Sequence, residues 1–136
     1  PFEIGKANML RQGNDVTIIA CGLMVAAALE AAHDLADEEI QARVLDMHTI
    51  KPIDADTIEN AARETGAIVT AEEHLLDGGL GSAVARVVAE RHPVPMAYIG
   101  MHNRFAESGK PQELLEKYGL MPADIVRAVK QVLKQK

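Results

Sequence analysis

The chain has 136 residues, of which 14 are basic and 20 acidic, and its formal net charge is −6; 48% of the residues are apolar but only 3% are aromatic. A single cysteine excludes a secreted fold stapled by internal disulfides, and no apolar stretch approaches the ~20 residues of a membrane span. The first residues do not resemble a signal peptide or a transit segment, and an acidic chain without a basic cluster is a poor nucleic-acid binder, so we expect one soluble, cytoplasmic α/β domain over residues 1–136.

The first half of the chain alternates strand and helix signals. Residues 16–20 form a β-branched run without polar alternation, which predicts a strand buried on both faces. Apolar residues at helical spacing over 25–36 predict an amphipathic helix, and residues 43–47 predict the next strand. Asp54 is a suitable N-cap for a following helix, and Gly66 is placed to end that helix in a left-handed conformation.

The second half of the chain repeats this alternation. Residues 67–71 predict a third buried strand, and the glycine-rich residues 78–82 open a further helix. Residues 96–100 predict the next strand. Two helices are expected to finish the chain, one between Pro111 and Gly119 and one that begins near Pro122.

Strands that alternate with helices favour right-handed crossovers and a parallel sheet. We therefore predict an α/β fold in three layers, helix–sheet–helix, with a mostly parallel sheet of about five strands. Residues 5–10 are a candidate edge strand.

Function in such sheets concentrates beyond the carboxyl ends of the strands. Four short segments are predicted to lie there, and together we call them the strand-end rim: residues 21–23, 46–48, 72–74 and 100–103. Three of the five histidines of the chain fall in this rim.

Glu72, Glu73 and His74 are the candidate acid–base cluster of the rim. Adjacent side chains on a strand point to opposite faces, so the two carboxylates are not expected to act as one dyad. A contact with another domain is the alternative role for these residues. Asn103 and Arg104 join them as candidates, because an arginine in a loop can pair with a carboxylate or a phosphate.

Gly78, Gly79, Gly81 and Ser82 form a candidate anion site at a helix start. Glycines there let backbone N–H groups approach an anion, which the helix dipole favours. The cluster lacks the lysine of a phosphate-binding P-loop and the spacing of a dinucleotide fingerprint. The alternative interpretation is that these glycines allow tight packing against a neighbouring backbone.

Metal binding and nucleophilic catalysis are the remaining chemical hypotheses. His48, His74 and His102 all follow predicted strands and could converge on zinc, but the tight spacing typical of zinc ligands is missing. Cys21 is a possible nucleophile, and a buried, inert thiol is the usual state of a lone cysteine.

Six blocks of the sequence, in the right order, resemble the transketolase C-terminal domain. Within the wider superfamily, the Met-His-Thr-Ile-Lys-Pro sequence at 47–52 and the Ala-Glu-Glu-His sequence at 71–74 favour transketolase over related enzymes. Asn103 stands where relatives commonly have an aspartate. The blocks are residues 4–6, 11–22, 44–54, 69–74, 78–84 and 103–109.

This resemblance implies the C-terminal subunit of a two-chain transketolase. The family transfers a two-carbon ketol unit between sugar phosphates with thiamine diphosphate and a divalent cation such as Mg²⁺. Other domains bind this cofactor and metal, and neither a pyrimidine-binding domain nor a Gly-Asp-Gly motif is found here. The chain alone is therefore expected to be inactive, to bind no cofactor or metal, and to contribute no catalytic residue.

The resemblance also implies the partners of the chain. They are the pyrimidine-binding domain and the diphosphate-binding subunit of the same enzyme, in a homodimer whose active site lies between subunits. The expected role of the chain is packing and assembly. Two alternatives stay open: the same domain in deoxyxylulose phosphate synthase or a 2-oxoacid dehydrogenase beta subunit, and a regulatory module that binds a small anion.

Overall fold

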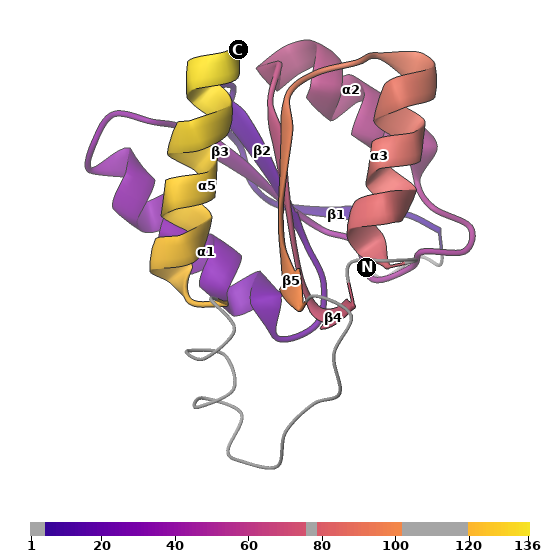
Figure 1. Cartoon of the computed structure of the whole chain (residues 1–136), viewed down its shortest axis with the longest axis horizontal. Helices are drawn as coiled ribbons and strands as arrows, with labels where there is room; N and C mark the ends of the chain where they lie inside the picture. The colour runs from indigo at the N-terminus through magenta and orange to yellow at the C-terminus, as the bar shows by residue number, and fades with distance from the viewer. Residues whose placement is uncertain (1–4, 76–78, 102–119) are drawn as a thin grey trace.

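Residues 5–75, 79–101 and 120–136 are described by the computed structural model, and they form a sheet between two pairs of helices (Figure 1). The sheet has five strands in the order β1-β3-β2-β4-β5. Its strands are β1 (Asn8–Arg11), β2 (Val16–Ala20), β3 (Ala42–Asp46), β4 (Ile68–Leu75) and β5 (Met96–Met101). The helices of the described ranges are α1 (Met24–Ala36), α2 (Ala55–Thr65), α3 (Leu80–Arg91) and α5 (Pro122–Gln135). The expected helix between Pro111 and Gly119 lies outside these ranges.

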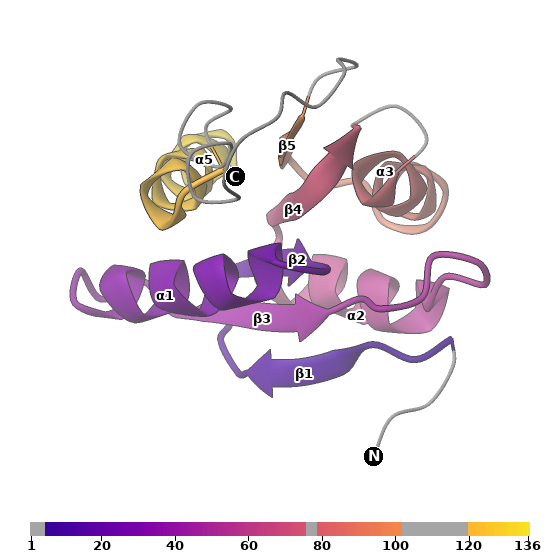
Figure 2. The ribbon, with the colours of Figure 1, turned by 90° about the horizontal axis from the view of Figure 1, so that it is seen from below.

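The sheet is parallel except at one edge, where β1 runs antiparallel to β3 with Asn8 opposite Asp46. Figure 2 shows β1 at this edge, and β3 lies between it and β2. The candidate edge strand is thus confirmed, although it begins three residues later and ends one residue later than predicted. Strands β2, β3, β4 and β5 run in the same direction. Their carboxyl ends therefore lie at the same end of the sheet.

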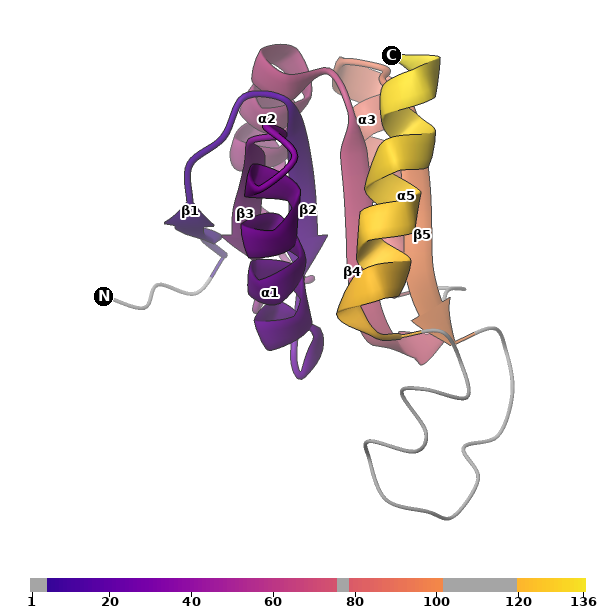
Figure 3. The same cartoon turned by 90° about the vertical axis from the view of Figure 1, so that its left-hand side faces the viewer.

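Each face of the sheet is covered by two helices, which confirms the three-layer prediction. One core joins α1 and α5 to the side of β2 that carries Ile18. The other joins α2 and α3 to the side that carries Ile19, and Figure 3 shows the helices on both sides of the strands. Strand β2 is buried along its whole length, as its unbroken apolar run predicted. No helix in the described ranges is long and apolar enough to cross a membrane.

Both predicted ends of α2 are confirmed. The Asp54 carboxylate accepts hydrogen bonds from the N–H of Thr57 (3.2 Å), the Thr57 hydroxyl (2.6 Å) and the N–H of Ala7 (3.0 Å). Burial raises the pKa of this carboxyl, but the three hydrogen bonds and the charge of Lys6 together outweigh burial and hold the pKa below its usual value. At the other end of the helix, Gly66 adopts a left-handed conformation with φ 72°.

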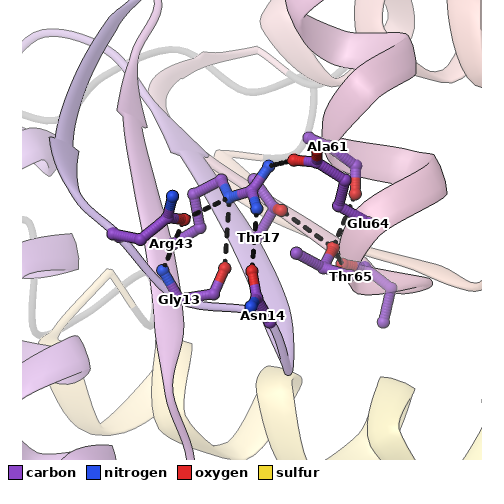
Figure 4. A network of polar contacts seen from close by, with 9 residues as sticks. Gly13, Asn14, Thr17, Arg43, Ala61, Glu64 and Thr65 are labelled. Atoms are coloured by element: carbon purple, nitrogen blue, oxygen red, sulfur yellow. Dashed lines mark hydrogen bonds and ion pairs between the residues drawn. The ribbon is translucent and has the colours of Figure 1, made fainter.

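A buried arginine joins three parts of the chain at the amino-terminal end of the strands (Figure 4). Arg43 of β3 is 3% exposed. Its Nε donates to the Gly13 carbonyl and the Gln12 amide oxygen, both at 3.1 Å. Its other nitrogens donate to Asn14 Oδ1 (3.0 Å) and to the Glu64 carboxylate (2.6 Å). The guanidinium thereby ties the β1–β2 connection to α2, a link that the sequence did not indicate.

Candidate functional site: the strand-end rim

The parallel strands bring the described part of the strand-end rim together as the sequence predicted. One difference concerns β4, which was expected to end before Glu72 but continues to Leu75. Gly78, Asn103 and Arg104 lie outside the described residues, as does the side chain of His74.

Glu72 holds the first turn of α3. Its side chain is 1% exposed. One carboxylate oxygen accepts a hydrogen bond from the N–H of Leu80 at 2.9 Å, and the other accepts one from the N–H of Gly81 at 2.7 Å. The first N–H groups of a helix have no partner within the helix, and the helix dipole favours negative charge there. Glu72 therefore supplies both the missing acceptors and the charge.

Glu73 does the same for α1 on the opposite face of the sheet. Its Oε2 accepts a hydrogen bond from the N–H of Leu23, which flanks the first turn of α1, at 2.8 Å. Gly22 precedes Leu23 with a left-handed φ of 61°. A Cβ atom at this glycine would collide with the Glu73 carboxylate. The prediction that the two adjacent glutamates point to opposite faces is confirmed.

The capping role of the two glutamates was not predicted, although the sequence contains a signal for it. Neither Leu23 nor Gly79, the residues that flank α1 and α3, provides a side-chain cap. Two adjacent glutamates at the end of a buried strand are suited to supply both caps, one on each face.

The glycine cluster is packed closely where the structure describes it. A Cβ atom on Gly81 would lie 2.9 Å from Tyr98 Cδ1 and 3.2 Å from Thr70 Oγ1. The tight-packing interpretation thus holds for Gly81, with the difference that side chains rather than backbone are its neighbours. Gly79 flanks the helix, and Ser82 is exposed in its first turn.

These contacts bear on whether this helix start fits a diphosphate. The N–H groups of Leu80 and Gly81 already donate to Glu72. The oxygens of a bound diphosphate would need the position that the buried Glu72 carboxylate already occupies. The described residues of the cluster therefore do not fit a diphosphate. Binding of a small anion elsewhere around Gly79 and Ser82 stays a prediction.

The described side chains do not form a metal centre. Within residues 5–75, 79–101 and 120–136, there is no group of three or more His, Cys, Asp or Glu side chains that could hold a metal ion. His48 is half-buried in the rim. The alternative hypothesis of a zinc site stays untested, because His102 and the side chain of His74 lie outside the described residues.

Cys21 directly follows the last residue of β2, lies in the rim and is half-buried. Burial, followed by the negative charges of Glu72, Glu73 and Asp46, raises the pKa of its thiol from 9.0 to about 11. Since the thiolate is the reactive form, we expect alkylation of Cys21 by iodoacetamide at pH 8 to be about 100-fold slower than that of an unperturbed cysteine. The rate should rise steadily up to about pH 11, and a plateau near pH 9 would show that the thiol is not perturbed.

Comparison with known proteins gives a family model, two relatives and a solved structure that match the chain. Residues 5–125 match the family model described as transketolase, C-terminal domain. The chain is 48% identical over 135 residues to the 6-deoxy-6-sulfo-D-fructose transketolase subunit SqwH of Clostridium sp. (strain MSTE9), and 43% identical over 131 residues to the 1-deoxy-D-xylulose-5-phosphate synthase of Heliobacterium modesticaldum. A solved structure described as a split gene transketolase, inactive beta4 tetramer, superposes with a TM-score of 0.93 at 53% identity.

These matches cover nearly all of this chain but only part of each relative. The SqwH match covers 99% of this chain but 42% of SqwH, and the synthase match covers 95% of this chain but 20% of the synthase. The structural match covers 98% of this chain and 44% of the tetramer subunit. The chain therefore corresponds to less than half of the proteins that it matches.

Proposed function

The chain belongs to the transketolase C-terminal domain family, and on this premise we propose that it is the structural and assembly domain of a two-chain transketolase. In this proposal the complete enzyme transfers a two-carbon ketol unit between sugar phosphates. Thiamine diphosphate and Mg²⁺ supply the carbanion chemistry and are bound by other domains. This chain folds against those domains and helps the enzyme to assemble.

The observation that carries the proposal is the superposition on a split gene transketolase subunit at a TM-score of 0.93 and 53% identity. The relative SqwH is itself named as a transketolase subunit. The synthase is less similar, at 43% identity. Deoxyxylulose phosphate synthase is therefore the second candidate for the complete enzyme.

The contacts of the two rim glutamates support a structural role for the chain. A general acid or base needs a carboxylate that can reach substrate. Both oxygens of Glu72 instead accept hydrogen bonds from the start of α3, and one oxygen of Glu73 accepts a hydrogen bond at the start of α1. These groups hold helices in place and leave the reacting atoms to the rest of the enzyme.

The proposed partners follow from the same reasoning. They are the pyrimidine-binding domain, which would precede this domain in the same polypeptide, and a separate diphosphate-binding subunit. The similar solved protein is described as a tetramer of beta subunits, which supports association between copies of the chain. A homodimer in the cytoplasm is the arrangement that we propose for the active enzyme.

An activity assay separates the two candidate enzymes. We expect the full-length polypeptide, mixed with its diphosphate-binding subunit, thiamine diphosphate and Mg²⁺, to transfer a ketol unit from a ketose phosphate to an aldose phosphate. Neither subunit alone is expected to turn over, because the proposed active site requires both. The control replaces the donor with pyruvate and the acceptor with glyceraldehyde 3-phosphate, and release of CO₂ with formation of deoxyxylulose phosphate would favour the synthase instead.

A further inference from the structure

Strand β5 forms one lateral edge of the sheet. Among residues 5–75, 79–101 and 120–136, only β4 pairs with it, and Figure 2 shows it between α3 and α5, on the far side of the sheet from β1. An edge strand presents a row of backbone N–H and C=O groups that can pair with another chain. Proteins usually protect such strands by short length, charges, prolines or bulges.

The edge at β1 has this protection, whereas the edge at β5 lacks it. Strand β1 has four residues, ends on Arg11 and has an irregular register between Met9 and Arg11. Strand β5 has six residues, Met-Ala-Tyr-Ile-Gly-Met, without a charge or a proline. Residues 96–99 pair in unbroken register with residues 68–71 of β4. A regular, uncharged edge of this kind is suited to receive a further strand.

Three residues of β5 direct their backbone groups away from β4. The N–H of Ile68 donates to the carbonyl of Pro95 at 3.1 Å, and Ile68 lies opposite Met96. Along a strand, residues bonded to one neighbour alternate with residues whose N–H and C=O groups point to the other side. The backbone groups of Met96, Tyr98 and Gly100 therefore point outwards from the sheet.

A groove lies on each face of the sheet beside this strand. The groove towards α5 has a volume of about 450 Å³, and Asp124 and Arg127 are among its lining residues. The groove towards α3 has a volume of about 370 Å³ and is lined by uncharged residues. The side chains of an added strand would alternate between these two faces. Asp124 and Arg127 form an ion pair, so their opposite charges would not make two copies of this edge repel each other.

The sequence of β5 is complementary to itself in one antiparallel register. When Tyr98 lies opposite Tyr98 of a second copy, Met96 lies opposite Gly100 and Ala97 lies opposite Ile99. Each large side chain then meets a small one, and the two tyrosines form an aromatic pair on the two-fold axis. All three outward-facing residues exchange N–H···O bonds with the residue opposite.

Other registers fit less well. A shift by two residues leaves either Met96 or Gly100 without a partner in the opposite strand. A shift by one residue would set side chains of opposite faces against each other. The strand itself therefore identifies a second copy of this chain as its partner and Tyr98 as the centre of the contact.

We propose that β5 pairs antiparallel with β5 of a second copy, centred on Tyr98, so that the two five-stranded sheets join into one. Such an interface is isologous, because each copy contributes the same surface. The inference rests on the proposed association between copies of the chain, to which it adds the surface and the register. It does not depend on which reaction the complete enzyme catalyses.

Cross-linking of the full-length polypeptide tests this pairing. Tyr98→Cys and Leu10→Cys are each introduced into a Cys21→Ala background, and both positions are 44% exposed. A short bismaleimide is added, and cross-linked peptides are quantified by mass spectrometry. A link between two copies of the same cysteine can only join two chains. We expect about 10-fold or more of this link at position 98 than at position 10, because opposing Cα atoms in a hydrogen-bonded antiparallel pair are about 5.5 Å apart.

Charged variants test whether position 98 lies opposite itself. Tyr98→Lys and Tyr98→Glu each place like charges opposite one another, whereas a mixture of the two variants places a lysine opposite a glutamate. Pairing is followed by hydrogen exchange of the amides of residues 96–101. We expect each variant alone to exchange about 10-fold or more faster than the unchanged protein, and the mixture to regain most of the protection, since exchange reports opening of the hydrogen-bonded strand. Leu10→Lys and Leu10→Glu should leave this exchange unchanged.

The outcomes separate the pairing from the other proposals. Equal linking at positions 98 and 10 would overturn the pairing, as would a mixture that regains no protection; a misfolded variant would not be rescued by mixing. If sedimentation velocity shows associated copies without a link at position 98, another surface joins them, and only the association stands. Ketol transfer is measured separately, so a link at position 98 without ketol transfer would reject the proposed transketolase and keep the pairing.

Discussion

Replacing Glu72 with alanine is expected to lower the free energy of unfolding by about 3 kcal/mol, because it removes the partner of two buried N–H groups. These groups belong to Leu80 and Gly81 and have no acceptor within α3. Each buried donor left without an acceptor costs about 1–3 kcal/mol, and the lost attraction to the helix dipole adds to this cost. Urea unfolding followed by circular dichroism measures the effect.

Two further variants show whether the carboxylate is the cause. Glu72→Gln keeps the shape of the side chain and one acceptor oxygen, so it should cost about half as much as Glu72→Ala. Glu90→Ala removes a glutamate from the exposed ion pair with Arg86 on the same helix, and it should cost less than about 0.5 kcal/mol. If Glu72→Ala were no more costly than Glu90→Ala, the capping role would be rejected.

Replacing Arg43 with methionine is expected to cost about 3 kcal/mol of unfolding free energy. Methionine fills much of the space of the buried stem but cannot donate to any of the four acceptors that the guanidinium contacts (Figure 4). The carbonyl of Gly13 loses its side-chain donor, and the β1–β2 connection is released from α2. Unfolding in urea again provides the measurement.

The geometry of the guanidinium predicts the pattern among Arg43 variants. Arg43→Lys keeps the charge but has one nitrogen in place of a planar fork, so it should recover less than half of the loss. Arg63→Met serves as the control, because Arg63 is exposed and pairs with Glu59 one turn away on α2, and it should change stability by less than about 0.5 kcal/mol. Full recovery by lysine would mean that charge alone, and not the hydrogen-bond geometry, stabilises this region.

Local signals in the sequence were sufficient for most of the fold. The unbroken apolar run of β2 indicated a strand that is buried on both faces. The apolar residues at helical spacing in α1 and α5 indicated helices with one buried face. Asp54 and Gly66 mark the ends of α2 through bonds to residues within four positions. The end of β4 was less well predicted, because glutamates in a strand are unfavourable unless a distant group satisfies them.

The candidate site was predictable in outline but not in its chemistry. Because β2, β3 and β4 are parallel, Cys21, Asp46 and Glu72 lie near the same end of the sheet, so the location of the rim followed from the order of elements. The hydrogen-bond partners of its glutamates did not follow, because residue types at strand ends are equally compatible with acid–base chemistry or anion binding, whereas the structure shows helix capping.

By itself, the sequence determined the order and type of the elements, the layered α/β architecture and the family, because each of these depends on residues close together in the chain or on matching blocks of sequence. Only the tertiary structure decided that Glu73 reaches Leu23, 50 positions away, and that Arg43 reaches Gly13, 30 positions away. Such contacts depend on which strands become neighbours, and a local pattern of polar and apolar residues does not contain that information.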